Sequence, residues 1–204
     1  MGLRLLILDL WTPKYIIRKE LANVSEQTTA ALESLLAGYT FKELAGTTKQ
    51  HVQVDIEQQR ANMAKTQAKL VETLEAVLGH EKAVTIGREV LFSVGENLGN
   101  QIRSRLGIGS SLKDLTKAAK ILYRVLGIEF HMEWVDKSNA KVVIDRCALA
   151  EHYSKLTCEV LSATDEGVIK GLQPNVRMKF RDYMTSGCHN CRADLYFNEK
   201  ETME

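Results

Sequence analysis

The chain has 204 residues and a formal net charge of +1, with 45% hydrophobic and 26% charged residues. Such a composition is typical of a soluble globular protein with enough apolar residues for a core. The near-neutral balance gives no electrostatic reason to expect nucleic acid or an anionic membrane as the main partner. The apolar opening, residues 3–11, is shorter than the roughly 20 residues of a spanning helix, and no signal-peptide cleavage site follows it. We therefore expect a cytoplasmic protein without a membrane span.

The first 126 residues have the composition of helices, with capping and terminating residues between the apolar segments. Thr12 and Pro13 form a typical helix start, and Thr40 with Glu43 resembles a second capping box. Four helices are expected, over residues 13–38, about 52–78, about 81–106 and 112–126. The second is markedly polar in its first half, so it is either largely solvated or packed against a partner chain.

Three glycines, Gly87, Gly95 and Gly99, interrupt the apolar pattern of the third expected helix and lie near one face of it. In a helix each is less favourable than alanine by up to about 1 kcal/mol. They indicate close approach of another backbone or of a ligand, and we favour tight helix packing.

After Gly127 the apolar period changes from helical to alternating. This pattern predicts strands over residues 128–135, 141–145, 176–184 and 191–197, with a hairpin between the first two. A helical stretch over about 148–171, with a break near Cys158, separates the second strand from the third. The predicted fold is α+β: N-terminal helices followed by a mostly antiparallel four-stranded sheet with a helical insertion. We expect residues 1–80 to form a helical extension that mediates homodimerisation, and residues 81–204 to form an α+β small-molecule-binding domain.

The four cysteines all lie in the last quarter of the chain, at Cys147, Cys158, Cys188 and Cys191. The predicted topology places them at strand ends, in the insertion and in the last loop, so their sulfurs should converge at one edge of the sheet. Cys188 and Cys191 have the Cys-x2-Cys spacing that suits tetrahedral thiolate ligation. The four thiols, or three with a histidine, are therefore candidate ligands of zinc or of an iron–sulfur cluster.

Other interpretations of these cysteines stay open. One alternative is that the cysteines are buried thiols that pack as small hydrophobic groups. Another is that they form disulfides, which a reducing compartment disfavours. A third interpretation makes Cys147 reactive. Arg146 and the start of the following helix would lower its pKa, and His152, a little over one helical turn further on, would act as its base.

From position 145 onward the sequence resembles the L-2-amino-thiazoline-4-carboxylic acid hydrolase family. The resemblance is carried by residues 147–152 (CALAEH), Cys158, residues 165–172 (DEGVIKGL), and residues 184–187 (MTSG) before Cys191. It implies opening of a cyclic amidine-like C–N bond by an activated water or thiolate. Cys188 departs from the family pattern, where an acidic residue is more usual. The additional thiol favours metal binding over hydrolysis.

The same C-terminal layout is also similar to the 4-vinyl-reductase (hydrocarbon-binding) domains. That similarity implies an apolar or tetrapyrrole-like ligand bound between the sheet and the helices.

Three functional hypotheses follow. The first is a hydrolase-like small-molecule protein with Cys147 and His152 as catalytic residues and a thiol-rich site. The second is a non-enzymatic ligand-binding or redox-sensing module in which the four cysteines hold zinc or an iron–sulfur cluster. The third is a helical interaction protein whose polar helix, about 52–78, is the functional element.

Overall fold

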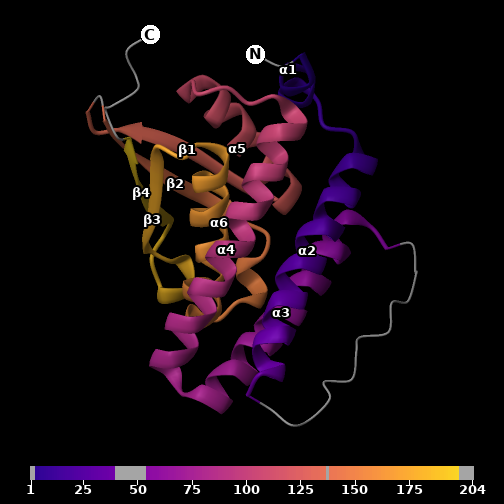
Figure 1. Ribbon diagram of the computed structural model, residues 1–204, viewed down its shortest axis with the longest axis vertical. Coiled ribbons are helices and arrows are strands. Elements are labelled where there is room, and N and C mark those ends of the chain that lie inside the picture. Colours follow the sequence, from indigo (N-terminus) through magenta and orange to yellow (C-terminus); the bar gives the residue numbers. More distant parts are fainter. Residues whose placement is uncertain (1–2, 40–53, 137, 198–204) are drawn as a thin grey trace.

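A computed structural model describes residues 3–39, 54–136 and 138–197 of the chain (Figure 1). In chain order its elements are α1 (Leu3–Leu10), α2 (Lys14–Ala37), α3 (Ile56–Leu78), α4 (His80–Leu106), α5 (Leu112–Leu126), β1 (Ile128–Trp134), β2 (Asn139–Cys147), the 3-10 helix η1 (Ala150–His152), α6 (Lys155–Leu172), β3 (Val176–Asp182), the 3-10 helix η2 (Met184–Ser186) and β4 (Cys191–Phe197). The predicted α+β class is confirmed. Over the same described ranges, every helix falls short of the length and apolarity that crossing a membrane requires.

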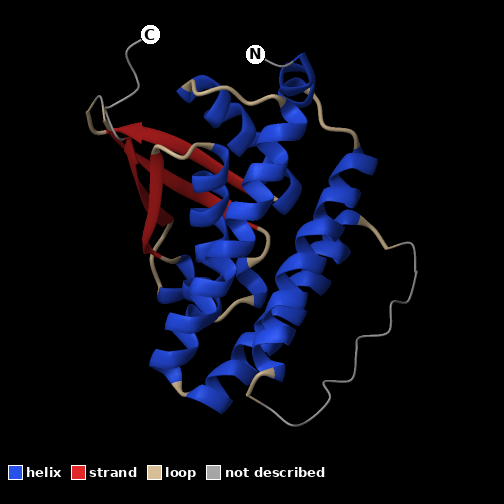
Figure 2. Cartoon of the chain, in the orientation of Figure 1, coloured by secondary structure: helices blue, strands red, loops and turns tan. Residues whose placement is uncertain are grey.

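The four strands form one antiparallel sheet in the order β1-β2-β4-β3 (Figure 2). β1 and β2 form the predicted hairpin, in whose turn the Asp136 carboxylate accepts hydrogen bonds from Ser138 N and Asn139 Nδ2. The insertion formed by η1 and α6 carries the chain across the sheet, so β4 returns between β2 and β3. One face of the sheet is buried and apolar, and consists of Ile128, Ala140, Val142, Ile144, Val176, Met178, Phe180, Cys191, Ala193 and Leu195.

The sheet, the helices α4 and α6, and the pair α2 and α3 follow one another from left to right in Figure 1. One core cluster joins the buried face of the sheet to α5 and α6. A second joins four helices through Leu36 of α2, Leu74 of α3, Leu91 of α4 and Val160 of α6. α4 and α6 both take part in the two clusters, so this helix pair connects the sheet side of the fold to α2 and α3.

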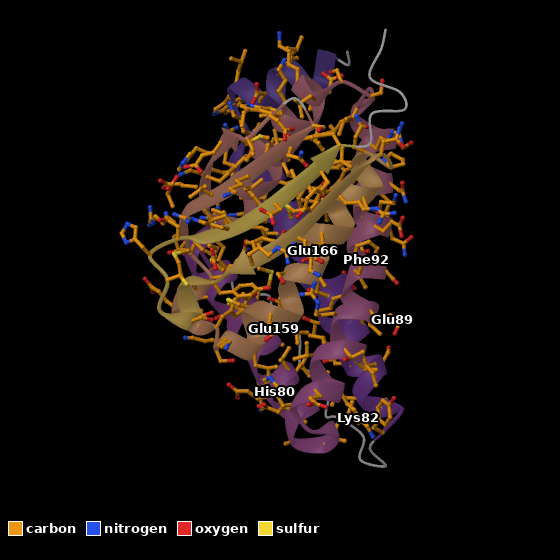
Figure 3. All side chains as sticks on the ribbon, turned by 90° about the vertical axis from the view of Figure 1, so that its left-hand side faces the viewer. His80, Lys82, Glu89, Phe92, Glu159 and Glu166 are labelled. Carbon is orange, nitrogen blue, oxygen red and sulfur yellow. The ribbon has the colours of Figure 1, made fainter. Side chains whose placement is uncertain are left out.

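α4 and α6 cross with their backbones in contact. A Cβ atom added at Gly95 would lie 2.1 Å from the carbonyl oxygen of Thr164, and one added at Gly167 would lie 2.1 Å from that of Phe92. Figure 3 shows Phe92 of α4 beside Glu166 of α6 at this crossing. The prediction that the α4 glycines serve tight helix packing is confirmed. Gly167 and Gly171 of α6 lie at the same crossing and allow the close approach from the other side.

Among the predicted boundaries that differ from the structure, two have a local physical cause. Thr12 does not cap α2, because its hydroxyl donates a hydrogen bond to Leu8 O at 2.8 Å and so closes α1 instead. The break in the insertion falls before Lys155 and not near Cys158, because Ser154 Oγ accepts a hydrogen bond from Thr157 N and caps α6. Cys158 therefore lies inside α6. The expected capping box at residues 40–43 lies outside the described residues.

The polar first half of α3 packs within its own chain. Arg60 is 7% exposed, and its guanidinium donates hydrogen bonds to Val125 O and Arg124 O, at the end of α5. Gln67 is buried between α2 and α3, where its Nε2 donates to Thr28 Oγ1. The two helices expected to form an extension thus share cores with the rest of the chain, and the predicted division at residue 80 and homodimerisation stay predictions.

Candidate functional site

Two adjoining cavities lie between the buried face of the sheet and the helices. The thiol chamber, of about 100 Å³, is lined by three of the cysteines. The apolar chamber, of about 70 Å³, has almost entirely apolar walls. Both are lined by Val24 of α2, Leu126 of α5, and Thr164 and Asp165 of α6, so the chambers meet at these residues. The fold therefore contains a two-part cavity with a polar junction.

The thiol chamber brings together Cys147 from the end of β2, Cys158 from α6 and Cys191 from the start of β4. All four cysteines are free thiols. The Cys191 sulfur accepts a hydrogen bond from Met184 N at 3.3 Å. Cys188 is exposed on the loop before β4 and lines neither chamber. Three of the four predicted site cysteines thus share one space, because the insertion folds α6 back over the ends of β2 and β4.

Burial controls the chemistry of these thiols. It raises the pKa of Cys147 to about 11, although the backbone N–H groups of Leu149 and Ala150 act in the opposite direction. It raises the pKa of Cys158 to about 12 and also raises that of Cys191. The direction is opposite to the low pKa that the sequence predicted for Cys147, because loss of water outweighs the nearby N–H groups. The chamber therefore holds neutral thiols at physiological pH.

His152 lies on η1, outside both chambers. It lines an outer polar groove with Arg146, Glu151 and Cys147. Cys147 lines both this groove and the thiol chamber, so it is part of the wall between them. The catalytic roles predicted for Cys147 and His152 stay predictions.

No group of three or more His, Cys, Asp or Glu side chains within residues 3–39, 54–136 and 138–197 is arranged to hold a metal ion. The predicted ligands Cys147, Cys158 and Cys191 surround a cavity, while Cys188 is exposed. Zinc or an iron–sulfur cluster at the cysteines stays a prediction.

Asp165 is the ionisable group at the junction of the chambers. Its side chain lines both chambers and is half-buried, and burial raises its pKa to about 7, with a smaller contribution from the negative charge of Glu166. Among the described residues no side chain or backbone group forms a hydrogen bond with its carboxyl. A carboxyl on a cavity wall with a pKa raised toward neutrality marks a candidate binding or catalytic group. Sequence reasoning assigned it no role, although its helical spacing from Cys158 and Ser162 places it on the same face of α6.

Further polar groups line the junction and the thiol chamber. Thr164 Oγ1 is buried without a hydrogen-bond partner in the described structure. The Tyr183 hydroxyl shares a hydrogen bond of 3.1 Å with Ser162 Oγ, which also accepts one from Arg88 Nη1 at 3.0 Å. The Tyr153 hydroxyl, also on the chamber wall, donates to Gln67 Oε1. The chamber is thus apolar with a few fixed polar groups, as small-molecule sites commonly are.

A protein-family model described as L-2-amino-thiazoline-4-carboxylic acid hydrolase matches residues 57–194, which is more than half of the chain. The matched segment runs from the first turn of α3 to the middle of β4, and it includes most of the cavity wall. No curated protein matches the sequence.

Solved structures show a similar fold at low sequence identity. Trafficking protein particle complex subunit 3 from Naegleria fowleri, covalently bound to palmitic acid, is 17% identical with a TM-score of 0.54, over 69% of this chain and 95% of that chain. The phenol-responsive sensory domain of the transcription activator PoxR, solved with phenol, is 15% identical with a TM-score of 0.48, over 85% and 91%. An H-NOX protein from S. oneidensis is 12% identical with a TM-score of 0.46, over 88% and 98%. The first similarity supports the fold, and the other two are too low to support a functional inference.

Proposed function

Because the chain belongs to the L-2-amino-thiazoline-4-carboxylic acid hydrolase family, we propose that it binds a small molecule in its two-part cavity and hydrolyses a cyclic C–N bond there. The observation that most supports this proposal is Asp165, a carboxyl on the cavity wall with no partner among the described residues and a pKa of about 7. A group with a pKa near neutrality both accepts and releases a proton at physiological pH, as general acid–base catalysis requires.

In the proposed reaction a water molecule attacks the carbon of the cyclic C–N bond. One proton of the water passes to the Asp165 carboxylate as the new C–O bond forms. That proton then passes to the ring nitrogen as the C–N bond breaks, so Asp165 ends as it began. The unpartnered hydroxyl of Thr164 is available to hydrogen-bond with the water or the substrate.

Cys147 is the alternative nucleophile in this proposal. Its thiol would attack the same carbon and transfer its proton to Asp165, since a thiol with a pKa of about 11 needs a base to react near neutral pH. Water would later release the ring-opened product from the sulfur. His152 would assist from the outer groove that it shares with Cys147.

A second candidate function is ligand binding without turnover. It is favoured by the predominance of neutral and apolar groups, because burial keeps the three chamber thiols protonated. Such a module would sense a ligand, or oxidation or metal binding by the thiols of Cys147, Cys158 and Cys191. Metal binding would require the chamber walls to move, because no suitable group of ligands occurs in the described ranges.

Ring opening distinguishes the two functions. We would incubate the protein with L-2-amino-thiazoline-4-carboxylic acid and with 2-amino-thiazoline, and measure the hydrolysis product by mass spectrometry. Asp165→Asn should reduce turnover about 100-fold or more, whereas Asp9→Asn, a matched change on α1, should not. Equal turnover by Asp165→Asn would overturn the role of Asp165. Binding of either compound without product from the unmodified protein would favour the second candidate.

A further inference from the structure

We propose that the two-part cavity selects apolar organic cations, that is, molecules in which an amine or amidinium group is attached to an apolar body. This inference rests on the proposed function, because it names the class of molecule that the cavity would bind. The distribution of charge on the cavity walls carries it.

The charged groups that line the cavity are both carboxyls, Glu20 and Asp165. Within the described residues, neither chamber is lined by a lysine, an arginine or a histidine. Glu20 already has a partner, because its carboxylate accepts hydrogen bonds from Arg105 Nη1 and Nη2 at 3.0 and 3.3 Å. Asp165 has no such partner among the described residues, so this part of the chain gives the cavity one acidic group without a counter-charge.

The neighbouring cation is already engaged. Arg88 Nη2 donates to Glu166 Oε2 at 2.7 Å, and its Nη1 donates to Ser162 Oγ and to Glu159 O. A buried carboxylate is unfavourable unless it is paired and hydrogen-bonded. A ligand that brings a positive charge and N–H donors to Asp165 would supply both, whereas a ligand carboxylate would be repelled.

The apolar chamber suits the other end of such a molecule. Its walls include Leu98, Ile102 and Met132, and the rings of Tyr123 and Phe130 meet edge to face at 4.9 Å. Aromatic faces attract organic cations in addition to burying apolar surface. The charged group would therefore lie at the junction, beside Asp165 and Thr164, with the apolar body in the apolar chamber.

The charge of the cavity does not match the compound in the family name. The carboxylate of L-2-amino-thiazoline-4-carboxylic acid would find no basic partner on the cavity walls within the described ranges. A cyclic amidine without a carboxylate matches the charge of the cavity better.

The test is a series of three ring compounds of similar size, measured by isothermal titration calorimetry at pH 8. We expect benzylamine to bind at least about tenfold more tightly than benzyl alcohol, and benzoate to bind most weakly. Equal or tighter binding of benzyl alcohol or benzoate would overturn the charge selectivity while leaving small-molecule binding intact. If none of the three binds, the binding step of the proposed function fails as well.

Two variants locate the effect. Asp165→Asn should bind benzylamine and benzyl alcohol with the same affinity, and circular dichroism checks that it is folded. Asp9→Asn is the matched control, since it removes a carboxyl on α1 that lines neither chamber, and it should keep the preference. Retention of the preference in Asp165→Asn would overturn the assignment of Asp165. The ligand series on the unmodified protein decides the inference even if a variant does not fold.

Discussion

The two faces of α6 differ sharply, although they belong to one helix. On the face toward α4, Gly167 and Gly171 bring backbone against backbone, and added Cβ atoms would lie 2.1 and 2.2 Å from carbonyl oxygens of α4. On the face toward the sheet, Cys158 and Asp165 border a cavity. The first face is packed without space, and the second leaves space around polar groups.

The carboxyls of Asp165 and Glu166, which are adjacent in the sequence, differ in a similar way. Glu166 accepts hydrogen bonds from Arg88 Nη2 and from Phe180 N, at 2.7 and 3.1 Å. Asp165, one position earlier, has no partner in the described structure and a pKa of about 7. Glu166 thus stabilises the fold, while Asp165 is held in an unfavourable environment by the packing around it, as is common at functional sites.

The largest expected effect comes from filling the packed face. Gly167→Ala places a Cβ atom against the carbonyl of Phe92, so α4 and α6 must separate. We expect the free energy of unfolding to fall by about 3 kcal/mol or more in urea titration. Gly38→Ala is the matched control, because Gly38 has a helical backbone at the end of α2, and it should change stability by less than about 1 kcal/mol. Equal effects in the two variants would mean that the crossing tolerates extra volume.

Breaking the paired carboxyl should have the next largest effect. Glu166→Gln leaves Arg88 without its ionic partner, and the Glu166 side chain is only 9% exposed. Loss of one member of a buried pair typically lowers stability by about 3 kcal/mol, and the partial exposure of Arg88 reduces this to about 2. Chemical denaturation at pH 7 measures it. An unchanged midpoint would show that the pair contributes nothing to the fold.

Removing the charge of Asp165 should raise the free energy of unfolding, whereas removing the charge of Glu166 should lower it. The pKa of Asp165 is raised from 3.8 to about 7, so the folded protein binds this proton more tightly than the unfolded chain. Its contribution to stability therefore falls as the pH rises from about 4 to about 7, and is constant above that range. A shift of about 3 units corresponds to at most about 4 kcal/mol.

Asp165→Asn should remove this pH dependence. Because the new amide is also unpaired, we expect a gain of about 2 kcal/mol at pH 8 and little change near pH 4. Thermal unfolding of both proteins across this range measures the difference, with Asp9→Asn as the control. A variant less stable than the unmodified protein at pH 8 would show that the carboxyl has a partner in solution.

The smallest expected effect is on the reaction rates of the cysteine thiols. Cys188 is exposed, while Cys147, Cys158 and Cys191 line an interior chamber. With a thiol-specific disulfide reagent at pH 8, we expect one thiol to react at once and three to react slowly, because only thiolates attack and burial raises the pKa values of these three thiols. Cys188→Ser should remove only the fast phase. A second fast thiol in that variant would indicate that the reagent reaches Cys147 from the outer groove or that the chamber opens readily.

Local signals predicted most of the fold. Ser111 and Gly127 bound α5 as expected, because a cap and a left-handed glycine act within a few residues. The strand β4 begins and ends where the alternating pattern does. Ser154 was overlooked as the cap of α6, because the surrounding sequence is compatible with helix on both sides of it.

The site was harder to predict, because it depends on distant partners. Asp165 and Glu166 are adjacent and chemically alike, and α6 is buried on two faces, so helical periodicity does not identify which carboxyl is free. Arg88, which lies 78 positions from Glu166, decides it. The clustering of cysteines predicted that thiols would meet, but not that the loop before β4 would leave Cys188 exposed.

Two wall positions of the thiol chamber, Val24 and Thr28, belong to α2. This helix precedes the segment that the family model matches, residues 57–194. Substitutions in α2 can thus reshape the binding site while the matched segment stays unchanged. A change of ligand preference therefore needs no substitution within the segment that defines the family, residues 57–194.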